Sequence, residues 1–299
     1  MRVYIGGFVS RRFALRGVRT ARAVRAAVSR PPYVAPGHFY SPLTSDSDVA
    51  RALTWSGAPG VEMAEAAQLQ LAAKLASDMS QPLAGPRYKA ENSMYGPGDG
   101  SVDRAMLRQF RPRRVVEVGS GFSTAVALDV ADESDGLPDL KITCIEPYPQ
   151  RLLSLLGQAD RERVSIIRQP VQDVQVAAFE QLEPGDFLFI DSTHVVKAGS
   201  DVAWLFLHVL PLLKPGVIVH VHDLFWPFEY PEEWLRERRD WTEAYLVHAF
   251  LSGNADWEIL FFASWLWRCH PELVPAHLAA EGPGALWLRR RGEATSGVS

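Results

Sequence analysis

Two acidic side chains and two histidines close two apolar runs of the sequence, and such residues can move protons or bind cations. Asp191 ends one run and is followed three positions later by His194, while His222 and Asp223 end another run. If the two runs are neighbouring strands, about 4.8 Å apart, the two carboxylates can share a divalent cation or an acceptor hydroxyl. We therefore expect Asp191 and Asp223 to be catalytic residues and candidate metal ligands.

His194 is the candidate general base of this group, because imidazole titrates close to working pH. We expect its ring to reach the crevice beside Asp191, whereas His222, next to Asp223 on a strand, should point to the opposite face. Two alternatives stay open. Asp191 could only orient its loop, and His222 could be an ordinary strand residue, as could His220 two positions earlier.

A glycine turn follows the first apolar run of the main domain, in the segment 117–124 (Glu-Val-Gly-Ser-Gly-Phe-Ser-Thr). Glycines after a strand let the backbone turn tightly and approach a ligand at the start of the next helix. A dinucleotide site would favour a third glycine at the position of Thr124. The acid Glu117, two residues before the first glycine, can instead receive the cationic methionine end of S-adenosylmethionine.

A second acid, Glu146, ends the next apolar run, where it can accept hydrogen bonds from both ribose hydroxyls. A generic Rossmann-like turn with incidental acids is the alternative, but the combination favours an S-adenosylmethionine site. The expected cofactor-binding residues are Glu117, Gly119, Ser120, Gly121, Ser123, Thr124, Glu146, Pro147 and Asp191.

Apolar runs that alternate with helical patterns must position these residues. The runs lie at residues 114–118, 140–145, 164–167, 187–190 and 217–221, and helices are expected at 62–79, 101–110, 124–131, 150–157, 176–182 and 201–213. Continuous apolar strands separated by helices are typical of a parallel sheet that is covered on both faces. A long helix at 232–251 and strands at 257–263 and 285–290 complete the pattern. We predict an α/β fold with a doubly wound, mostly parallel seven-stranded sheet.

An aromatic segment follows Asp223 and could form the wall of an acceptor pocket. Phe225 and Trp226 are the expected lining residues, together with His222 and with Tyr95 on the opposite lip. The alternative is that the aromatics of this region pack a helix on the sheet or bury a dimer contact. That alternative is preferred for Trp234 and Trp241, and a homodimer stays open.

The charge of the chain is unevenly distributed. Residues 1–45 contain eight arginines and no acid, so with a net charge of −4 the rest of the chain carries −12. The basic arm could contact an anionic partner, for example by peripheral binding to a membrane surface; a solvated arm, or one docked on the acidic body, is the alternative. No run approaches the roughly 20 apolar residues of a membrane span, and neither cysteine belongs to a ligand pattern. These features predict a cytoplasmic protein.

Composition and pattern divide the chain into four parts. We expect a basic arm and linker at residues 1–36, a helical cap at 37–110, a cofactor-binding domain at 111–292 and a disordered tail at 293–299.

The segments 117–124, 185–194 and 212–223 resemble the first, strand-four and strand-five motifs of class I methyltransferases. They are similar to the bacterial branch grouped as methyltransferase family 24, which is related to catechol O-methyltransferase-like enzymes. The resemblance covers about residues 85–265 and implies a class I fold, S-adenosylmethionine as donor and a small acceptor.

The resemblance also implies a magnesium site. In catechol O-methyltransferase-like enzymes, the strand-four acid and an Asp-Asn pair after strand five bind the ion, and a lysine is the base. Asp191 and Asp223 match the two acids, and His194 takes the place of the lysine. Leu224 replaces the asparagine and removes one ligand, which His194 or His222 could supply.

The resulting prediction is a methyltransferase that acts on an oxygen of a small molecule or sugar, as in natural-product or glycan modification. Transfer to nitrogen or to a peptide is one alternative, and a non-catalytic scaffold or sensor that binds the cofactor is another. A nucleic-acid substrate is not expected, because the body is acidic and no Asn/Asp-Pro-Pro-Tyr-like motif follows the fourth strand.

Overall fold

The computed structural model describes residues 33–83 and 85–292. Two compact units make up the chain, Met1–Ala52 and Leu53–Ser299. The predictions for the basic arm and the tail fall mostly on residues 1–32 and 293–299, which lie outside the described residues, and the predicted domain boundaries stay predictions. In the first unit, helix α2 (Asp46–Ala52) begins with a capping box, since Ser45 Oγ accepts from Asp48 N at 3.3 Å and Asp48 Oδ2 accepts from Ser45 N at 2.9 Å.

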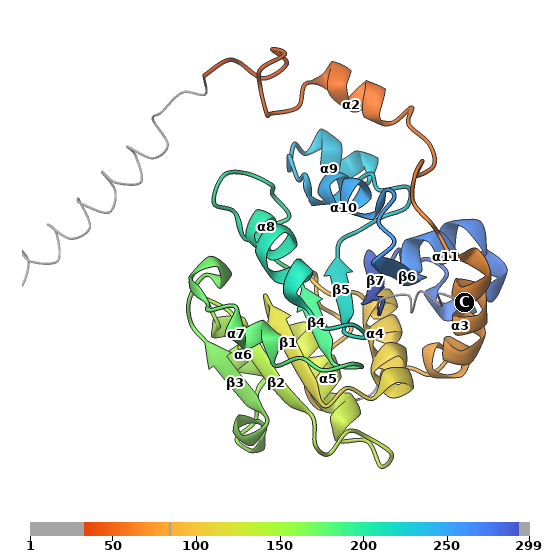
Figure 1. Cartoon of the computed structure of the whole chain (residues 1–299). Coiled ribbons are helices and arrows are strands. Elements are labelled where there is room, and N and C mark those ends of the chain that lie inside the picture. The colour runs from red at the N-terminus through yellow and green to blue at the C-terminus, as the bar shows by residue number, and fades with distance from the viewer. Residues whose placement is uncertain (1–32, 84, 293–299) are drawn as a thin grey trace, which may run out of the picture. The chain divides into compact units, whose positions relative to one another are not determined.

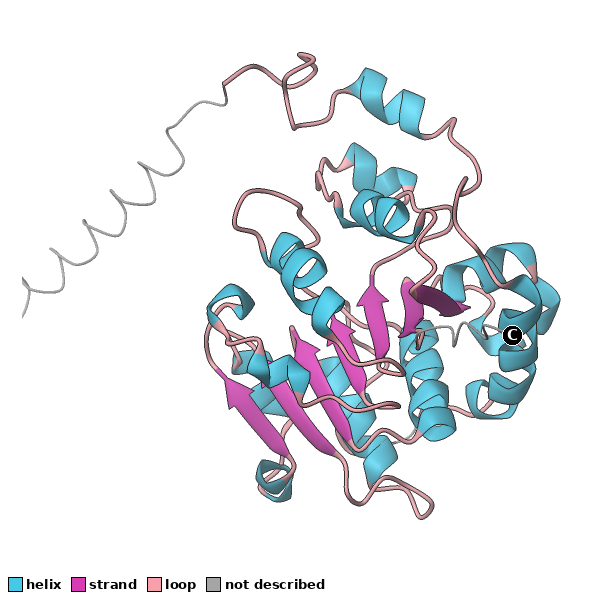
Figure 2. Ribbon diagram, viewed as in Figure 1, coloured by secondary structure: helices cyan, strands magenta, loops and turns pink. Residues whose placement is uncertain are grey.

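The second unit is built on one seven-stranded sheet with the order β3-β2-β1-β4-β5-β7-β6 (Figures 1 and 2). The first five strands are parallel, and β7 is antiparallel to both β5 and β6. The strands are β1 (Arg114–Val118), β2 (Lys141–Ile145), β3 (Val164–Ile167), β4 (Phe187–Ile190), β5 (Ile218–His222), β6 (Trp257–Phe262) and β7 (Ala285–Arg290). This arrangement confirms the predicted α/β class and the mostly parallel seven-stranded sheet.

Helices cover both faces of the sheet. Every residue of β4 and of β5 is buried, and because successive side chains point to opposite faces, both faces must be covered. The helices of this unit are α3 (Glu65–Met79), α4 (Pro97–Phe110), α5 (Phe122–Ala131), α6 (Gln150–Leu155), α7 (Ala177–Glu180), α8 (Asp201–Trp204), α9 (Glu232–Arg236), α10 (Glu243–Leu251) and α11 (Ala263–Cys269). Short 3₁₀ or π turns lie at η1 (Ala159–Glu162), η2 (Val171–Asp173), η3 (Leu205–Val209), η4 (Leu210–Leu212), η5 (Pro271–Leu273) and η6 (Ala276–Leu278). In the described part of the chain, each helix is too short or too polar to pass through a bilayer.

The strand register brings the carboxyl ends of four strands to one edge. Val118 of β1 pairs with Ile145 of β2 and with Ile190 of β4, and Ile190 pairs with Val221 of β5. The residues that follow these positions therefore lie side by side, as expected for parallel strands.

The predicted long helix at 232–251 is wrong. The chain forms α9 and α10, and between them Arg238 and Asp240 take left-handed φ values of 56° and 51°. The physical reason is a tertiary contact at the start of α10. The N–H groups of Thr242 and Glu243 donate to the carbonyl of His194, at 2.9 and 3.1 Å, instead of continuing a helix from α9.

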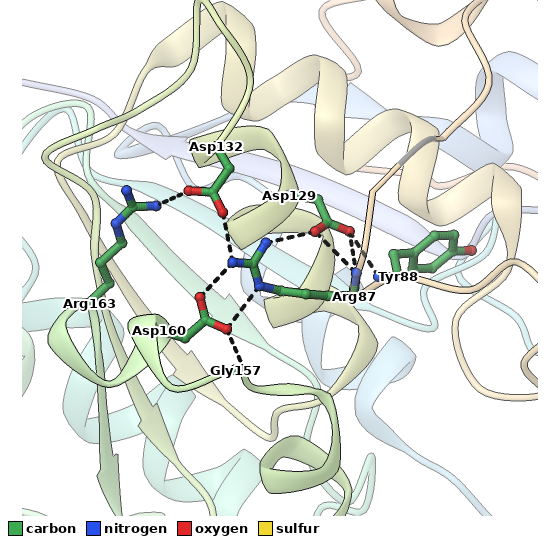
Figure 3. Close-up of polar contacts among 7 residues, drawn as sticks. All are labelled: Arg87, Tyr88, Asp129, Asp132, Gly157, Asp160 and Arg163. Carbon is green, nitrogen blue, oxygen red and sulfur yellow. Dashed lines mark hydrogen bonds and ion pairs between the residues drawn. The ribbon is translucent and has the colours of Figure 1, made fainter.

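An arginine clamp holds the segment that precedes α4 against the main domain (Figure 3). The partly buried guanidinium of Arg87 donates to Asp129 and Asp132, at the end of α5, and doubly to Asp160 in η1, over distances of 2.6–2.9 Å. Asp129 also accepts from the N–H of Tyr88 at 2.9 Å, and Tyr88 Oη donates to the carbonyl of Tyr95 at 2.9 Å. The clamp thereby fixes the backbone that leads to Tyr95.

Candidate functional site: a cofactor and acceptor pocket at the sheet edge

One hollow of about 280 Å³ lies at the carboxyl edge of the parallel strands. Residues that follow β1, β2, β4 and β5 all contribute to it, so the strand register assembles its walls. The lining residues are Met94, Tyr95, Gly119, Ser120, Gly121, Phe122, Ser123, Glu146, Arg151, Asp191, Ser192, Thr193, His194, His222, Asp223 and Trp241.

Gly119 permits the close approach of two strands at the floor of the hollow. Its φ is +79°, and a Cβ at this position would overlap the carbonyl oxygen of Asp191. Only glycine meets both conditions without strain. The turn therefore brings the backbone of the first strand directly beside the end of β4.

Glu117 lies below the glycine turn and is almost fully buried. Its carboxylate accepts hydrogen bonds from Ser123 Oγ, from Thr124 Oγ1 at 2.5 Å and from the thiol of Cys144 at 3.6 Å. Burial raises the pKa of Glu117 to about 7, against the effect of these hydrogen bonds. Thr124 Oγ1 in turn accepts from Gly121 N at 3.2 Å, so the acid braces the turn from beneath.

The expected cofactor residues do not all line the hollow. Glu117, Thr124 and Pro147 lie outside the described lining, whereas the other predicted residues belong to it. Glu146 lines the hollow and accepts from Tyr148 N at 2.7 Å.

Unpaired polar atoms line the hollow and suit a ligand with hydrogen-bonding groups. The hydroxyl oxygens of Tyr95, Ser120 and Ser192 are buried and have no hydrogen-bond partner among the described residues, and all three residues line the hollow. Because buried hydroxyls are normally paired, a ligand with several hydrogen-bonding groups fits this surface.

Asp191, His194 and Asp223 form one cluster in the wall of the hollow. His194 Nε2 lies 3.5 Å from Asp191 Oδ1 and 3.5 Å from Asp223 Oδ2, and His194 Nδ1 lies 2.9 Å from Glu243 Oε2. Burial lowers the pKa of His194, but the hydrogen bonds to Asp191 and Glu243 outweigh it and raise the pKa to about 10. The surrounding carboxylates therefore favour the protonated form of the ring.

The backbone is strained at two members of this cluster. His194 and Asp223 have φ values of 59° and 54°, in the left-handed region that side chains other than glycine rarely adopt. Hydrogen bonds hold both positions. His194 O accepts from the N–H groups of Thr242 and Glu243 at the start of α10, and next to Asp223 the N–H of Leu224 donates to Gly284 O at 3.1 Å. Strain of this kind persists where the surrounding structure imposes it, and it concentrates at functional sites.

The same cluster fits a divalent cation. One ligand atom from each of Asp191, His194 and Asp223 can be chosen so that all lie within 4.8 Å of one another. Two carboxylates and an imidazole suit manganese, iron or zinc at least as well as magnesium.

His222 lines the hollow, as the sequence predicted for the acceptor pocket, but it does not point to the opposite face from Asp223 as strand alternation predicted. It lines the hollow together with Asp223, its Nε2 lies 3.8 Å from Asp223 Oδ1, and its ring lies 5.1 Å from that of Tyr95 with a tilt of 31° between the ring planes. The left-handed turn at Asp223 breaks the strand alternation on which the expectation depended.

Phe225 and Trp226 were expected to line the acceptor pocket, but they are not among the residues that line the hollow. Phe225 packs edge-on against Trp234 at 5.2 Å, and Trp226 packs against Phe262 at 6.2 Å. Trp241, which the sequence assigned to packing, instead lines the hollow with its ring 4.3 Å from that of His194.

Sequence reasoning also missed Glu243, Arg151 and Met94. A signal for Glu243 existed in the sequence, because Thr242 followed by an acid and then by an apolar run is typical of a helix start. This signal predicts a helix that begins at Glu243, in place of one long helix over 232–251.

Known proteins resemble this chain in both sequence and fold. A family model described as a methyltransferase domain matches residues 116–224. An uncharacterized protein of Archaeoglobus fulgidus is 32% identical over 163 residues, which are 50% of this chain and 73% of that protein.

Solved structures with a similar fold include the O-methyltransferase TomG from Streptomyces achromogenes in complex with S-adenosylmethionine. It is 17% identical, with a TM-score of 0.44, over 82% of this chain and 96% of that chain. The apo form of CmcI is also 17% identical, with a TM-score of 0.44, over 69% of this chain and 76% of that chain.

The family assignment rests on the family model and on the sequence relative, and the strand order and glycine turn agree with it. The chain belongs to the methyltransferase family, as a class I enzyme that depends on S-adenosylmethionine.

Proposed function

We propose that this methyltransferase transfers the methyl group of S-adenosylmethionine to a hydroxyl oxygen of a small molecule or sugar. One observation carries the proposal. The glycine turn and Glu146 line the same hollow as Asp191, His194 and Asp223, so a donor and an acceptor can meet within it.

Methyl transfer requires an acceptor lone pair in line with the sulfonium-bound methyl group, at about 3–3.5 Å. A donor that lies over the glycine turn, with its ribose on Glu146, directs its methyl group towards Asp191. The acceptor oxygen then forms the new bond to carbon as the sulfur–carbon bond breaks, which leaves S-adenosylhomocysteine and releases the hydroxyl proton.

His194 Nε2 is the group placed to receive this proton, because it faces Asp191 and Asp223 at the acceptor end. In this role Asp191 and Asp223 would hold a divalent cation without His194, because Nε2 cannot bind the cation and receive the proton at the same time. When bound there, the cation lowers the pKa of the acceptor hydroxyl and offsets the negative charge that keeps His194 protonated. Trp241, beside His194, supplies a flat apolar surface for the acceptor.

The test is transfer of a radiolabelled methyl group from S-adenosylmethionine to panels of phenols, free and nucleotide-linked sugars, and amines, with and without prior chelation. We expect a hydroxyl acceptor, and we expect His194→Asn to lower the rate of transfer severely, to a residual rate, while S-adenosylhomocysteine still binds in calorimetry. His208→Asn, at an exposed helical position, is the matched control and should retain activity. Transfer to amines alone would contradict O-methylation, and full activity after chelation would remove the cation from the mechanism.

A further inference from the structure

A fully buried acid lies behind the histidine of the active site. Glu243, the first residue of α10, has no exposed surface, and its Oε2 lies 2.9 Å from His194 Nδ1. Its second oxygen, Oε1, is buried without a hydrogen-bond partner among the described residues. Burial of a carboxylate is costly unless it is paired, so the contact with His194 is the feature that accounts for the position of this side chain.

The backbone around Glu243 is joined to the loop of His194. Thr242 N and Glu243 N both donate to His194 O, and Thr242 Oγ1 accepts from Val196 N at 2.7 Å. These bonds hold the left-handed backbone of His194 and place the carboxylate directly behind its ring.

The orientation of the ring follows from these contacts. Nδ1 and Nε2 flank Cε1 of the imidazole and point in different directions, so a ring that donates from Nδ1 to Glu243 turns Nε2 towards Asp191 and Asp223. Trp241, packed on the ring, restricts rotation about the side-chain bonds.

We propose that Glu243 is a positioning residue that holds Nδ1–H of His194, so that Nε2 is presented to the acceptor hydroxyl. The inference rests on the proposed function for its catalytic consequence, but the hydrogen bond itself does not depend on the identity of the acceptor. Carboxylates that orient a catalytic or metal-binding histidine in this way contribute on the order of 10–100-fold to activity or metal affinity.

Nuclear magnetic resonance of protein labelled with ¹⁵N-histidine tests the hydrogen bond without an acceptor. An Nδ1–H that donates to a buried carboxylate gives a downfield, slowly exchanging proton signal. We expect one such signal in the wild-type protein, its loss in His194→Asn and its upfield shift in Glu243→Gln, because a neutral amide oxygen is a weaker acceptor than a carboxylate. The matched control is Glu229→Gln, because Glu229 is another carboxylate with one buried oxygen without a partner, and it contacts Tyr230 and Tyr245 instead of the site.

A signal that keeps its wild-type position in Glu243→Gln, or its absence from the wild-type spectrum, overturns the proposal. If Glu243→Gln does not fold, the wild-type and His194→Asn spectra decide, because Glu243 is intact in both. The nuclear magnetic resonance signal tests the hydrogen bond between His194 and Glu243 without any methyl acceptor. The proposed O-methylation is tested separately, and it fails if no hydroxyl compound in the methyl-transfer panel is methylated.

Kinetics with a hydroxyl acceptor from that panel test the consequence. We expect Glu243→Gln to lower kcat on the order of 10–100-fold, with the affinity for S-adenosylhomocysteine unchanged. In a His194→Asn background the same change should have no further effect, because the two residues act as one unit. Equal effects in both backgrounds would indicate a merely structural role and overturn the proposal.

Discussion

At the scale of single residues, Gly119 combines a left-handed φ with a lack of space for a side chain. Gly119→Ala should therefore distort the turn and lower the affinity for S-adenosylhomocysteine by at least about 100-fold. It should also lower the free energy of unfolding by roughly 1–2 kcal/mol, which is the strain that a left-handed conformation costs a side chain. Gly185→Ala is the matched control, because Gly185 has a φ of +88° but nothing within 4 Å of a new Cβ. It should cost only the strain, as measured by urea unfolding, and leave the calorimetric affinity unchanged.

Glu146 is the second residue on which cofactor affinity should depend. Its carboxylate faces the hollow, and hydrogen bonds to a charged group contribute about 1.5–3 kcal/mol each. We expect Glu146→Ala to weaken S-adenosylhomocysteine binding by at least about 10-fold while the protein stays folded. Glu180→Ala, at an exposed position of α7, is the control, and calorimetry that gives equal affinities for the two variants would contradict the ribose contact.

At the scale of elements, the Arg87 clamp joins the segment before α4 to α5 and η1. Arg87→Met would leave Asp129, Asp132 and Asp160 close together without their shared cation, and removal of one partner from a buried ion pair costs about 3–5 kcal/mol. Arg163→Met removes a single ion pair, with Asp132, from the edge of the network and should cost about 1 kcal/mol or less. Urea unfolding at pH 7 should rank the two variants in this order.

The clamp also predicts how stability depends on pH. Hydrogen bonds from Arg87 lower the pKa of Asp160, and they lower that of Asp132 against the opposing effect of burial. A carboxylate with a lowered folded-state pKa stabilises the protein above its unfolded pKa of about 3.9, and the contribution is lost as pH falls through the folded value. The difference in unfolding free energy between wild type and Arg87→Met should therefore shrink below about pH 4; a constant difference would show that these carboxylates are not the cause.

At the scale of the whole molecule, cofactor binding should stabilise the fold, because the hollow joins residues that follow four strands of one sheet. S-adenosylhomocysteine at 100 times its Kd should add about 2.7 kcal/mol to the unfolding free energy and raise Tm. NAD at the same concentration should give no shift. A shift with NAD but not with S-adenosylhomocysteine would favour the dinucleotide interpretation of the glycine turn.

Much of the fold could be predicted because its signals are local. The strands β1, β3, β4 and β7 begin and end where the apolar runs do, since continuous β-branched and aromatic residues favour buried strands. The cluster of Asp191, His194 and Asp223 could also be predicted, because carboxyl ends of parallel strands share one edge. The interruption between α9 and α10 could not, because hydrogen bonds to His194, nearly fifty positions earlier, cause it.

The sequence by itself determined the class of fold, the glycine turn and the acids that end the strands, because these follow from short-range periodicity and residue type. Only the tertiary structure decided that Glu243 and Trp241 contact His194, that His222 lines the hollow and that Phe225 and Trp226 do not. Each of these outcomes depends on a left-handed turn or on a hydrogen bond between segments distant in the chain, and neither leaves a local pattern.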